Sequence, residues 1–122
     1  MLDRCNRLRH RQDFTRVYQR GSRYQSSHLI LRAYRQPDQP TRIGVSVSQK
    51  VSKRAVVRNR IKRWLRSACR SLLSELQPGW DLVIGVRAQP VSQESPALEC
   101  DYQQFLQELK QLLAEAKLLH GH

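Results

Sequence analysis

The sequence predicts a single α+β domain whose elements follow the order α-β-β-α-β-α. The 122-residue length suits one domain with its own hydrophobic core. Three segments carry apolar side chains at the 3.6-residue spacing of amphipathic helices, and three others have the apolar patterns of strands. We therefore treat residues 1 to 122 as one domain.

The amino-terminal part predicts a short helix over residues 11 to 20. Phe14, Val17 and Tyr18 recur there at helical spacing and form one face. Gly21 follows directly, and glycine readily adopts the left-handed conformation that ends many helices. We expect Gly21 to end this helix in that conformation.

Two strands are predicted after this helix. Residues 28 to 35 alternate between two faces, and residues 41 to 48 alternate apolar with small or polar side chains. The segment between them, residues 36 to 40, is QPDQP and predicts a turn. We expect the two strands to pair with each other as a hairpin.

The second half predicts a long basic helix, a covered strand and a final helix. Apolar side chains recur at helical spacing from residue 54 to residue 76. Residues 80 to 86 form the continuous apolar run that is typical of a central strand. A loop over residues 87 to 100 then leads to an amphipathic helix over residues 101 to 119.

Positive charge is concentrated in the first three-fifths of the chain. Residues 1 to 74 hold 19 basic and 3 acidic side chains, whereas residues 75 to 122 hold 3 basic and 7 acidic ones. Residues 50 to 70 contain nine Lys or Arg side chains and no carboxylate. Like charges one helical turn apart repel each other, so this segment favours a polyanionic partner. The net charge of +12 favours a nucleic acid.

The long helix carries cations on both sides of its apolar stripe. Five of them recur every four residues and form a ridge that can follow a phosphate backbone: Arg54, Arg58, Lys62, Arg66 and Arg70. Arg60 projects from the other side of the stripe, and Asn59 offers a donor and an acceptor between them. A solvated helix face is the alternative interpretation, but such faces normally mix both signs of charge.

Two aromatic side chains on the first helix lie among arginines. Phe14 and Tyr18 are one helical turn apart in a segment that also holds six arginines, Arg4, Arg7, Arg9, Arg11, Arg16 and Arg20. Aromatic rings among cations suit unpaired RNA, because bases stack on the rings while the cations follow the backbone. Spacing alone favours burial of both rings in the core, so both interpretations stand at this point.

Several other functions find little support. There is no run of about 18 apolar residues and no apolar signal-peptide core at the amino terminus, so we expect a cytoplasmic protein that does not enter a membrane. Cys5, Cys69 and Cys100 form no CxxC pair, and the four histidines have no ligand spacing. The basic region lacks the carboxylates that a protein nuclease needs, so we assign no catalytic residue and no metal ligand.

Two separated segments resemble the bacterial ribonuclease P protein subunit. Residues 42 to 66, RIGVSVSQKVSKRAVVRNRIKRWLR, hold a strand ending in a VSxK-type sequence, a short loop and an RNRxKRxxR helix. Residues 7 to 21, RLRHRQDFTRVYQRG, resemble the opening of that family. The resemblance implies a central mixed sheet packed by helices, with the long basic helix and a cleft, as in ribonuclease P proteins and ribosomal S5 domain 2.

The resemblance also implies a function. Such a chain joins ribonuclease P RNA in an endoribonuclease holoenzyme that removes the 5′ leader of precursor tRNA at low Mg²⁺. Catalysis then resides in the RNA, which also holds most of the Mg²⁺, and we expect no cofactor on the protein and no obligate protein partner.

Site residues follow from motif position. The leader path is expected to include Phe14, Tyr18, Lys62 and Arg66. One further leader contact is expected from the strand over residues 28 to 35, where the choice between Arg32 and Tyr34 stays open. The face toward the RNA subunit is expected to include Lys50, Lys53, Arg54, Arg58, Asn59, Arg60 and Arg63.

Two alternatives remain from the sequence. A ribosomal or chaperone-type RNA-binding protein would share the charge without needing an aromatic path for a single strand. A DNA-binding protein using the long helix fits less well, because no turn-coupled helix pair or dimer zipper accompanies that helix.

Overall fold

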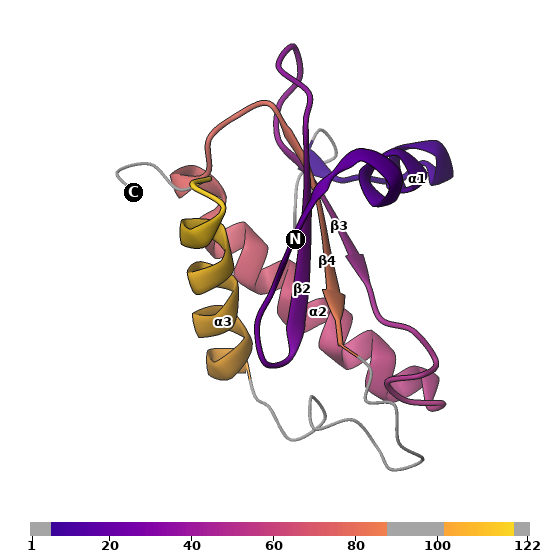
Figure 1. The fold of residues 1–122 in the computed structure, drawn as a ribbon. Helices are drawn as coiled ribbons and strands as arrows, with labels where there is room; N and C mark the ends of the chain where they lie inside the picture. The colour runs from indigo at the N-terminus through magenta and orange to yellow at the C-terminus, as the bar shows by residue number, and fades with distance from the viewer. Residues whose placement is uncertain (1–5, 88–101, 119–122) are drawn as a thin grey trace.

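The computed structural model describes residues 6–87 and 102–118 as a mixed four-stranded sheet with helices on both faces (Figure 1). The elements in chain order are α1 (Arg11–Arg20), β1 (Ser22–Gln25), β2 (Leu29–Arg35), β3 (Arg42–Ser46), α2 (Ala55–Leu72), the 3₁₀ turn η2 (Leu73–Glu75), β4 (Trp80–Val86) and α3 (Tyr102–Glu115). The predicted α+β class is confirmed, with one strand, β1, added to the predicted order.

The strand order in the sheet is β1-β2-β4-β3. β2 is antiparallel to both β1 and β4, whereas β3 is parallel to β4. The predicted hairpin between residues 28–35 and 41–48 is therefore wrong, because β4 lies between the two strands. The physical reason is the composition of β4, whose apolar run needs cover on both faces and therefore takes a central place.

The hairpin partner of β2 is β1, which the sequence analysis did not predict. Its four residues, SRYQ, are mostly exposed and carry no apolar alternation. This edge strand is held by its backbone hydrogen bonds to β2 and by one partly buried side chain, Tyr24, which packs against the main core. A single apolar contact gives no alternating pattern, so the sequence gave no signal for it.

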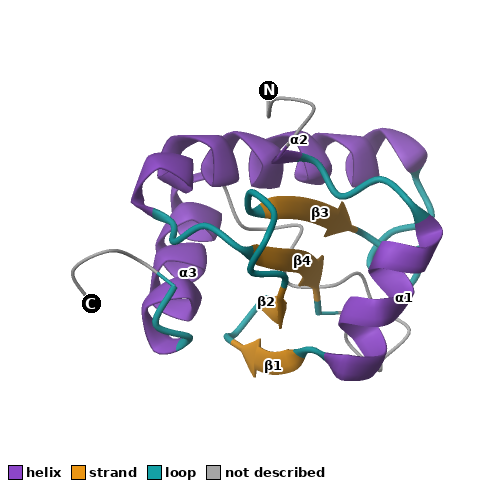
Figure 2. Cartoon of the chain, turned by 90° about the horizontal axis from the view of Figure 1, so that it is seen from above, coloured by secondary structure: helices purple, strands orange, loops and turns teal. Residues whose placement is uncertain are grey.

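One face of the sheet carries the main hydrophobic core. Leu31 of β2 and Ile84 of β4 point to this face and pack with α2 and α3, where Leu65 and Phe105 are fully buried. Figure 2 shows α3 on this side of the sheet and α2 running beside β3. Full burial of each large apolar side chain contributes about 1.5–3 kcal/mol, so this face supplies most of the stability.

Among the described residues, the opposite face is covered only by α1 and the segment before it (Figure 2). A second, small cluster lies there, with Leu8, Val17 and Val83 buried and Phe14 and Tyr34 packed against it. This cluster is much smaller than the main core. α1 is therefore held on the sheet by few apolar contacts and needs other interactions to fix its position.

The helix boundaries agree with the prediction for α1 and are shorter than predicted for α2. The predicted left-handed conformation of Gly21 is wrong, since its φ is −76° and its backbone is extended. Glycine is needed there for space, because a Cβ at Gly21 would lie 2.5 Å from the Val17 carbonyl oxygen. The predicted loop over residues 87–100 lies almost wholly outside the described residues.

α3 is tied to the β1–β2 turn through a buried carboxylate. Glu108 accepts hydrogen bonds from the Ser26 hydroxyl and the His28 backbone N–H, and the His28 ring Nδ1 lies 2.6 Å from its other oxygen. Burial tends to raise the pKa of Glu108, but the hydrogen bonds from Ser26 and His28 outweigh it, so the pKa lies below its usual value. The carboxylate therefore fastens the helix to the hairpin.

One of the three cysteines lies in the described residues. Cys69 is a free thiol buried in α2, and burial raises its pKa to about 12. A thiol in that state is protonated and unreactive at neutral pH. Cys5 and Cys100 lie outside the described residues.

Candidate nucleic-acid interface

The site is built on a row of residues that crosses the sheet on the face covered by α1. The strand register aligns Gly44 of β3 with Val83 of β4, and Val83 with Arg32 of β2. Because successive residues of a strand point to opposite faces, all three face α1. Their side chains differ in size, from none at Gly44 to a long cation at Arg32.

α1 lies over this row, and its two aromatic rings meet opposite ends of it. Phe14 fills the space above Gly44, where a Cβ would lie 2.5 Å from the ring. Tyr18 lies at the other end, with the Arg32 guanidinium 4.7 Å from its ring centroid in a cation–π contact. Phe14 is half-buried and Tyr18 is 45% exposed, so neither ring is enclosed in the core.

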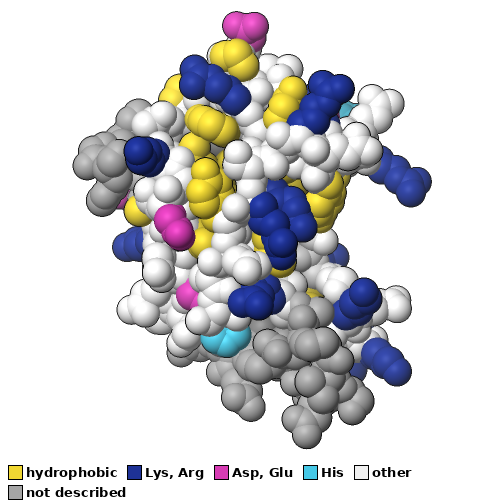
Figure 3. All heavy atoms as spheres, in the orientation of Figure 1, with side chains coloured by type: hydrophobic (Ala, Val, Ile, Leu, Met, Phe, Trp, Pro, Cys, Tyr) yellow, Lys and Arg dark blue, Asp and Glu magenta, His cyan; other side chains and the backbone are white. Residues whose placement is uncertain are grey.

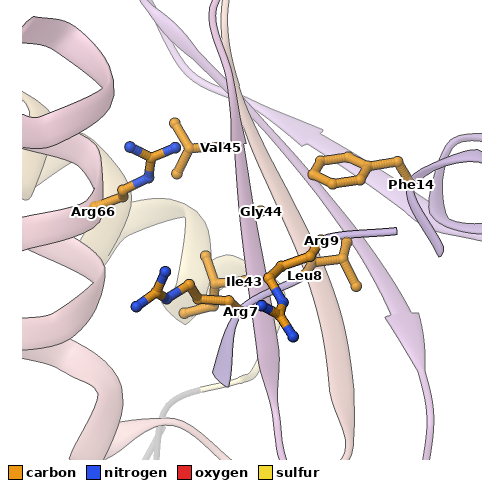
Figure 4. Close-up of a pocket in the computed structure, with 8 residues that line it drawn as sticks. All are labelled: Arg7, Leu8, Arg9, Phe14, Ile43, Gly44, Val45 and Arg66. Atoms are coloured by element: carbon orange, nitrogen blue, oxygen red, sulfur yellow. The ribbon is translucent and has the colours of Figure 1, made fainter. Parts of the chain in front are cut away.

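A cavity of about 360 Å³ opens beside Phe14. Its lining comes from the segment before α1, from α1, from β3 and from α2, as Arg7, Leu8, Arg9, Phe14, Ile43, Gly44, Val45 and Arg66. Figure 4 shows Phe14 reaching in from α1 on one side of β3 and Arg66 from α2 on the other. An aromatic ring and a guanidinium thus face a shared hollow in the sheet surface.

The sheet beside α1 continues as a floor whose residues on β3 and β4 are small. Ser46 of β3 pairs with Gly85 of β4, and Gly85 pairs with Ile30 of β2. A Cβ at Gly85 would meet only the Ser46 carbonyl oxygen, at 3.7 Å, among the described residues. Within residues 6–87 and 102–118, the sheet therefore leaves room at Gly85 for another chain. Glycine inside a strand often marks a place where another backbone or a ligand approaches closely. Gly44 and Gly85 therefore gave a signal in the sequence, although no prediction was based on them.

An arginine clamp fixes α1 to the sheet. Arg42 of β3 donates two hydrogen bonds to the fully buried Asp81 of β4, at 2.9 and 2.8 Å, and lies 3.4 Å from Asp13 of α1. The hydrogen bond to Asp81 raises the pKa of Arg42. Asp13 directly precedes Phe14, so the clamp holds the ring over the sheet.

The residues of this clamp were not predicted from the sequence. Asp81 was visible as a lone acid in an otherwise apolar strand, and such a group needs a buried partner. Its partner Arg42 lies 39 residues earlier in the chain. The pairing depends on the parallel contact between β3 and β4, which the predicted hairpin did not contain.

The four other residues predicted for the leader path are divided between α2 and β2. Lys62 is half-buried and Arg66 is exposed one turn further along α2, where Arg66 lines the Phe14 cavity. Arg32 lies over Tyr18, whereas Tyr34 packs against the small cluster beneath α1. The structure thus brings Phe14 and Arg66 together and pairs Tyr18 with Arg32.

The residues predicted for the RNA-subunit face spread over the β3–α2 loop and α2. Lys50, Lys53 and Arg54 are exposed on the loop, while Val51 and Ser52 between them are buried and anchor it. The Ser52 hydroxyl accepts a hydrogen bond from the Arg54 backbone N–H at 3.2 Å. The three cations therefore stand on a fixed loop rather than on a free one.

The remaining four lie on different sides of α2. Asn59 and Arg63 are exposed, whereas Arg58 is half-buried and donates to the Ser52 carbonyl oxygen at 2.9 Å. Arg60 lies over the Trp64 ring at 5.7 Å, and that ring in turn contacts Phe105 of α3 at 6.1 Å between centroids. Arg60 therefore sits on the α3 side of the helix, away from the Phe14 cavity.

Charge on the surface is predominantly positive. Figure 3 shows dark-blue Lys and Arg side chains spread over one face of the molecule, with few acidic ones.

In the described ranges, no group of three or more His, Cys, Asp or Glu side chains is arranged to hold a metal ion. None of the helices in residues 6–87 and 102–118 is long and apolar enough to cross a membrane.

Incompletely buried aromatic rings beside arginines, on the more open face of a small α+β domain, are typical of surfaces that bind RNA. A family model described as "Ribonuclease P" matches residues 2–117. The chain is 58% identical to the ribonuclease P protein component of Cyanothece sp., with both chains fully covered. It is 50% identical to that of Picosynechococcus sp., with 99% of this chain and 98% of the relative covered.

Solved structures agree with these sequence relatives. The ribonuclease P protein of Staphylococcus aureus superposes with a TM-score of 0.80 at 26% identity, over 94% of this chain and 98% of that one. That of Thermotoga maritima gives a TM-score of 0.75 at 26% identity, over 89% and 96%. The chain belongs to the ribonuclease P protein family, and its RNA-binding role follows from that membership.

Proposed function

We propose that this chain acts with a catalytic RNA, ribonuclease P RNA, and holds the single-stranded 5′ leader of precursor tRNA on the face covered by α1. The observation that carries this proposal is the pair of incompletely buried rings, Phe14 and Tyr18, at the two ends of one row across the sheet. Family membership favours this function over a ribosomal or chaperone-type RNA-binding protein.

The geometry of that face supports the proposed leader path. Unpaired bases stack on aromatic rings for about 1–3 kcal/mol each, and Phe14 and Tyr18 offer such rings. The floor of Ser46 and Gly85 beside α1 leaves room for the strand itself. Arg66 stands across the cavity from Phe14 and can neutralise phosphates. Of the two residues left open on β2, this proposal assigns the leader contact to Arg32, because Tyr34 packs beneath α1.

The RNA subunit is assigned to a different surface. The exposed cations of the β3–α2 loop, with Asn59 and Arg63 on α2, form a continuous chain segment without carboxylates. Arg58 supports this segment from below through its bond to Ser52. Two RNA surfaces on one small domain let the protein bridge a catalytic RNA and its substrate.

In this proposal, the Mg²⁺ of the holoenzyme is held mainly by the RNA. The described residues gather no metal-ligating cluster, so no step is assigned to a metal on the protein. Two polyanions repel each other, and a protein of net charge +12 between them reduces that repulsion. The expected result is a lower Mg²⁺ requirement for the complex than for the RNA alone, in the cytoplasm of a bacterial cell.

The direct test is cleavage of a 5′-extended precursor tRNA at low Mg²⁺ in three reactions: this protein alone, a bacterial ribonuclease P RNA alone, and both together. We expect cleavage only in the combined reaction. If the combined reaction stays as inactive as the RNA alone while the protein binds RNA tightly, the general RNA-binding alternative is preferred. Cleavage by the protein alone would contradict catalysis by the RNA.

A further inference from the structure

The outer face of α1, which points away from the sheet, carries a polar surface that neither proposed RNA contact uses. Its residues line one shallow hollow along the helix, as Arg11, Gln12, Thr15, Arg16, Gln19 and Arg20. The inner side of the same helix buries Asp13 and Val17. Figure 2 shows α1 at the edge of the molecule, with the sheet on one side only.

Positive charge on this outer face is not balanced by acids. The one carboxylate of α1 is Asp13, which is buried and shared between Arg42 and Arg16, the latter at 3.5 Å. No carboxylate of the described residues lies within ion-pair distance of Arg11 or Arg20. Three arginines therefore face outward from a ten-residue helix with a single, partial ion pair between them.

The arrangement of these arginines costs helix stability. Arg11 stands at the first helical position, where the helix dipole disfavours a cation, and the N-cap residue His10 makes no side-chain capping bond. Arg16 and Arg20 are one turn apart and repel each other. An exposed helix with no partner is expected to mix charges; the exposed side of α3, with Lys110 and Glu115, does so. A bound polyanion would offset these costs on α1.

The uncharged side chains on this face indicate which polyanion fits. Gln12, Thr15 and Gln19 offer donors and acceptors, and the face has no aromatic ring on which a base could stack. Base-paired RNA is recognised mainly through phosphates and 2′-hydroxyl groups across its shallow minor groove. The inner edge of α1, with Phe14 and Tyr18, has the opposite composition and suits unpaired bases.

We propose that the outer face of α1 is a second RNA-binding surface that takes the backbone of a base-paired RNA stem. In this arrangement α1 separates an unpaired strand on its inner edge from a paired stem on its outer face. The contact is distinct from the leader path and from the α2 surface, and it does not depend on either of them.

The test compares a variant on this face with a charge-matched control. Arg11→Gln/Arg20→Gln removes two charges and keeps good helix formers, and Lys110→Gln/Lys117→Gln removes two charges from the α3 region, which lies across the sheet. Affinity is measured for the full-length protein with a hairpin stem of about 16 base pairs, the span of a typical double-stranded RNA contact, and with an unpaired RNA of equal length. Both are titrated over a range of KCl concentrations.

The Arg11→Gln/Arg20→Gln variant is expected to bind the stem roughly tenfold more weakly, with a log–log salt slope shallower by about 1–2 because two phosphate contacts are lost. Its affinity for unpaired RNA should stay within about twofold of the wild type, and the control should stay within about twofold on both RNAs. Equal loss in the control would show a general charge effect, and equal loss on unpaired RNA would show no preference for a stem. Either result, or no loss at all, overturns the inference.

A second measurement covers the case in which the variant folds poorly. A photo-crosslinking amino acid at Gln12 of the otherwise unchanged chain is expected to attach to the hairpin stem in preference to the unpaired RNA. Crosslinking to unpaired RNA alone would overturn the inference. Neither measurement uses cleavage, so a protein that fails to activate ribonuclease P RNA can still satisfy both, and the two proposals can fail separately.

Discussion

The two faces of the sheet differ in the side chains that cover them. The face toward α2 and α3 is covered by two helices and holds aliphatic and aromatic side chains that are almost fully buried. The face toward α1 holds a small apolar cluster and an arginine clamp on a buried aspartate. It also holds two glycines, Gly44 beneath Phe14 and Gly85 in the floor beside it. One face therefore supplies most of the stability, and the other is left partly open, as the proposed leader path requires.

The buried charges of the α1 face are paired through one arginine. Each carboxylate buried on the α1 face, Asp13 and Asp81, contacts Arg42. The ring of Phe14 is placed by such a polar contact and by the space above Gly44 rather than by a large core. Contacts of this kind fix the position of the ring but add little stability. Mutations on the two faces should therefore differ in how much they lower the free energy of unfolding.

The largest expected difference is between core substitutions on the two faces. Phe105→Ala should lower the free energy of unfolding by about 3–5 kcal/mol, because it leaves a cavity between α2, α3 and the sheet. Val17→Ala on the other face removes less apolar volume and should cost about 2 kcal/mol. Urea unfolding followed by circular dichroism measures both. Equal losses would contradict the assignment of stability to the α2–α3 face.

The next largest loss of stability is expected when the arginine clamp is broken. Arg42→Met should cost about 3 kcal/mol or more, because it leaves the fully buried Asp81 without its partner. The double variant Arg42→Met/Asp81→Leu should recover part of this loss, since it removes the uncompensated charge. A double variant less stable than the single one would show that the clamp acts in some other way.

Gly44→Ala tests the placement of Phe14 with a smaller change. The new methyl group would meet the ring and push it from its position, at a cost of about 1–3 kcal/mol. Binding of RNA with an unpaired 5′ end should weaken at the same time. Gly85→Ala is the control for stability, since in the described part of the chain its methyl group would meet nothing closer than 3.7 Å. Equal effects of both substitutions on stability would contradict the close contact at Gly44.

The smallest effect is expected at the tie between α3 and the β1–β2 turn. Glu108→Gln should cost about 1–2 kcal/mol at pH 7, because charged hydrogen bonds to Ser26 and His28 become neutral ones. Folding lowers the pKa of Glu108, so its contribution is present above the unfolded value of about 4.3 and is lost as the pH falls through the lower folded pKa.

Unfolding by urea at several pH values checks that sign. The difference in stability between wild type and Glu108→Gln should be full at pH 7 and should shrink below about pH 4. A difference that grows on acidification would contradict the lowered pKa of Glu108.

Much of the fold could be predicted because local patterns carry it. α1, α2, β4 and the class of the domain follow from apolar spacing that short stretches of sequence contain. The strand order could not be predicted, because it depends on the contact of β3 with β4 across the whole of α2. β1 was missed because its pairing with β2 is a backbone interaction.

The candidate site divides in the same way. Cations and aromatic rings could be found from residue type and spacing, as Phe14 and Arg66 illustrate. The Asp81–Arg42 pair and the space above Gly44 could not, since each depends on atoms brought together from distant strands. The partial burial of Tyr34 likewise became visible only once α1 was placed on the sheet.

The central claim is that the rings on the α1 face bind an unpaired leader. The most direct test compares the affinity of the reconstituted protein–RNA complex for precursor tRNA and for mature tRNA. Phe14→Leu/Tyr18→Leu keeps apolar bulk but removes both rings, and Tyr18→Phe keeps both rings as the matched control. The account predicts a loss of roughly tenfold or more for the Leu variant on precursor tRNA alone, with mature tRNA unchanged and the control close to wild type. Equal loss on precursor and mature tRNA, or no loss, would contradict it.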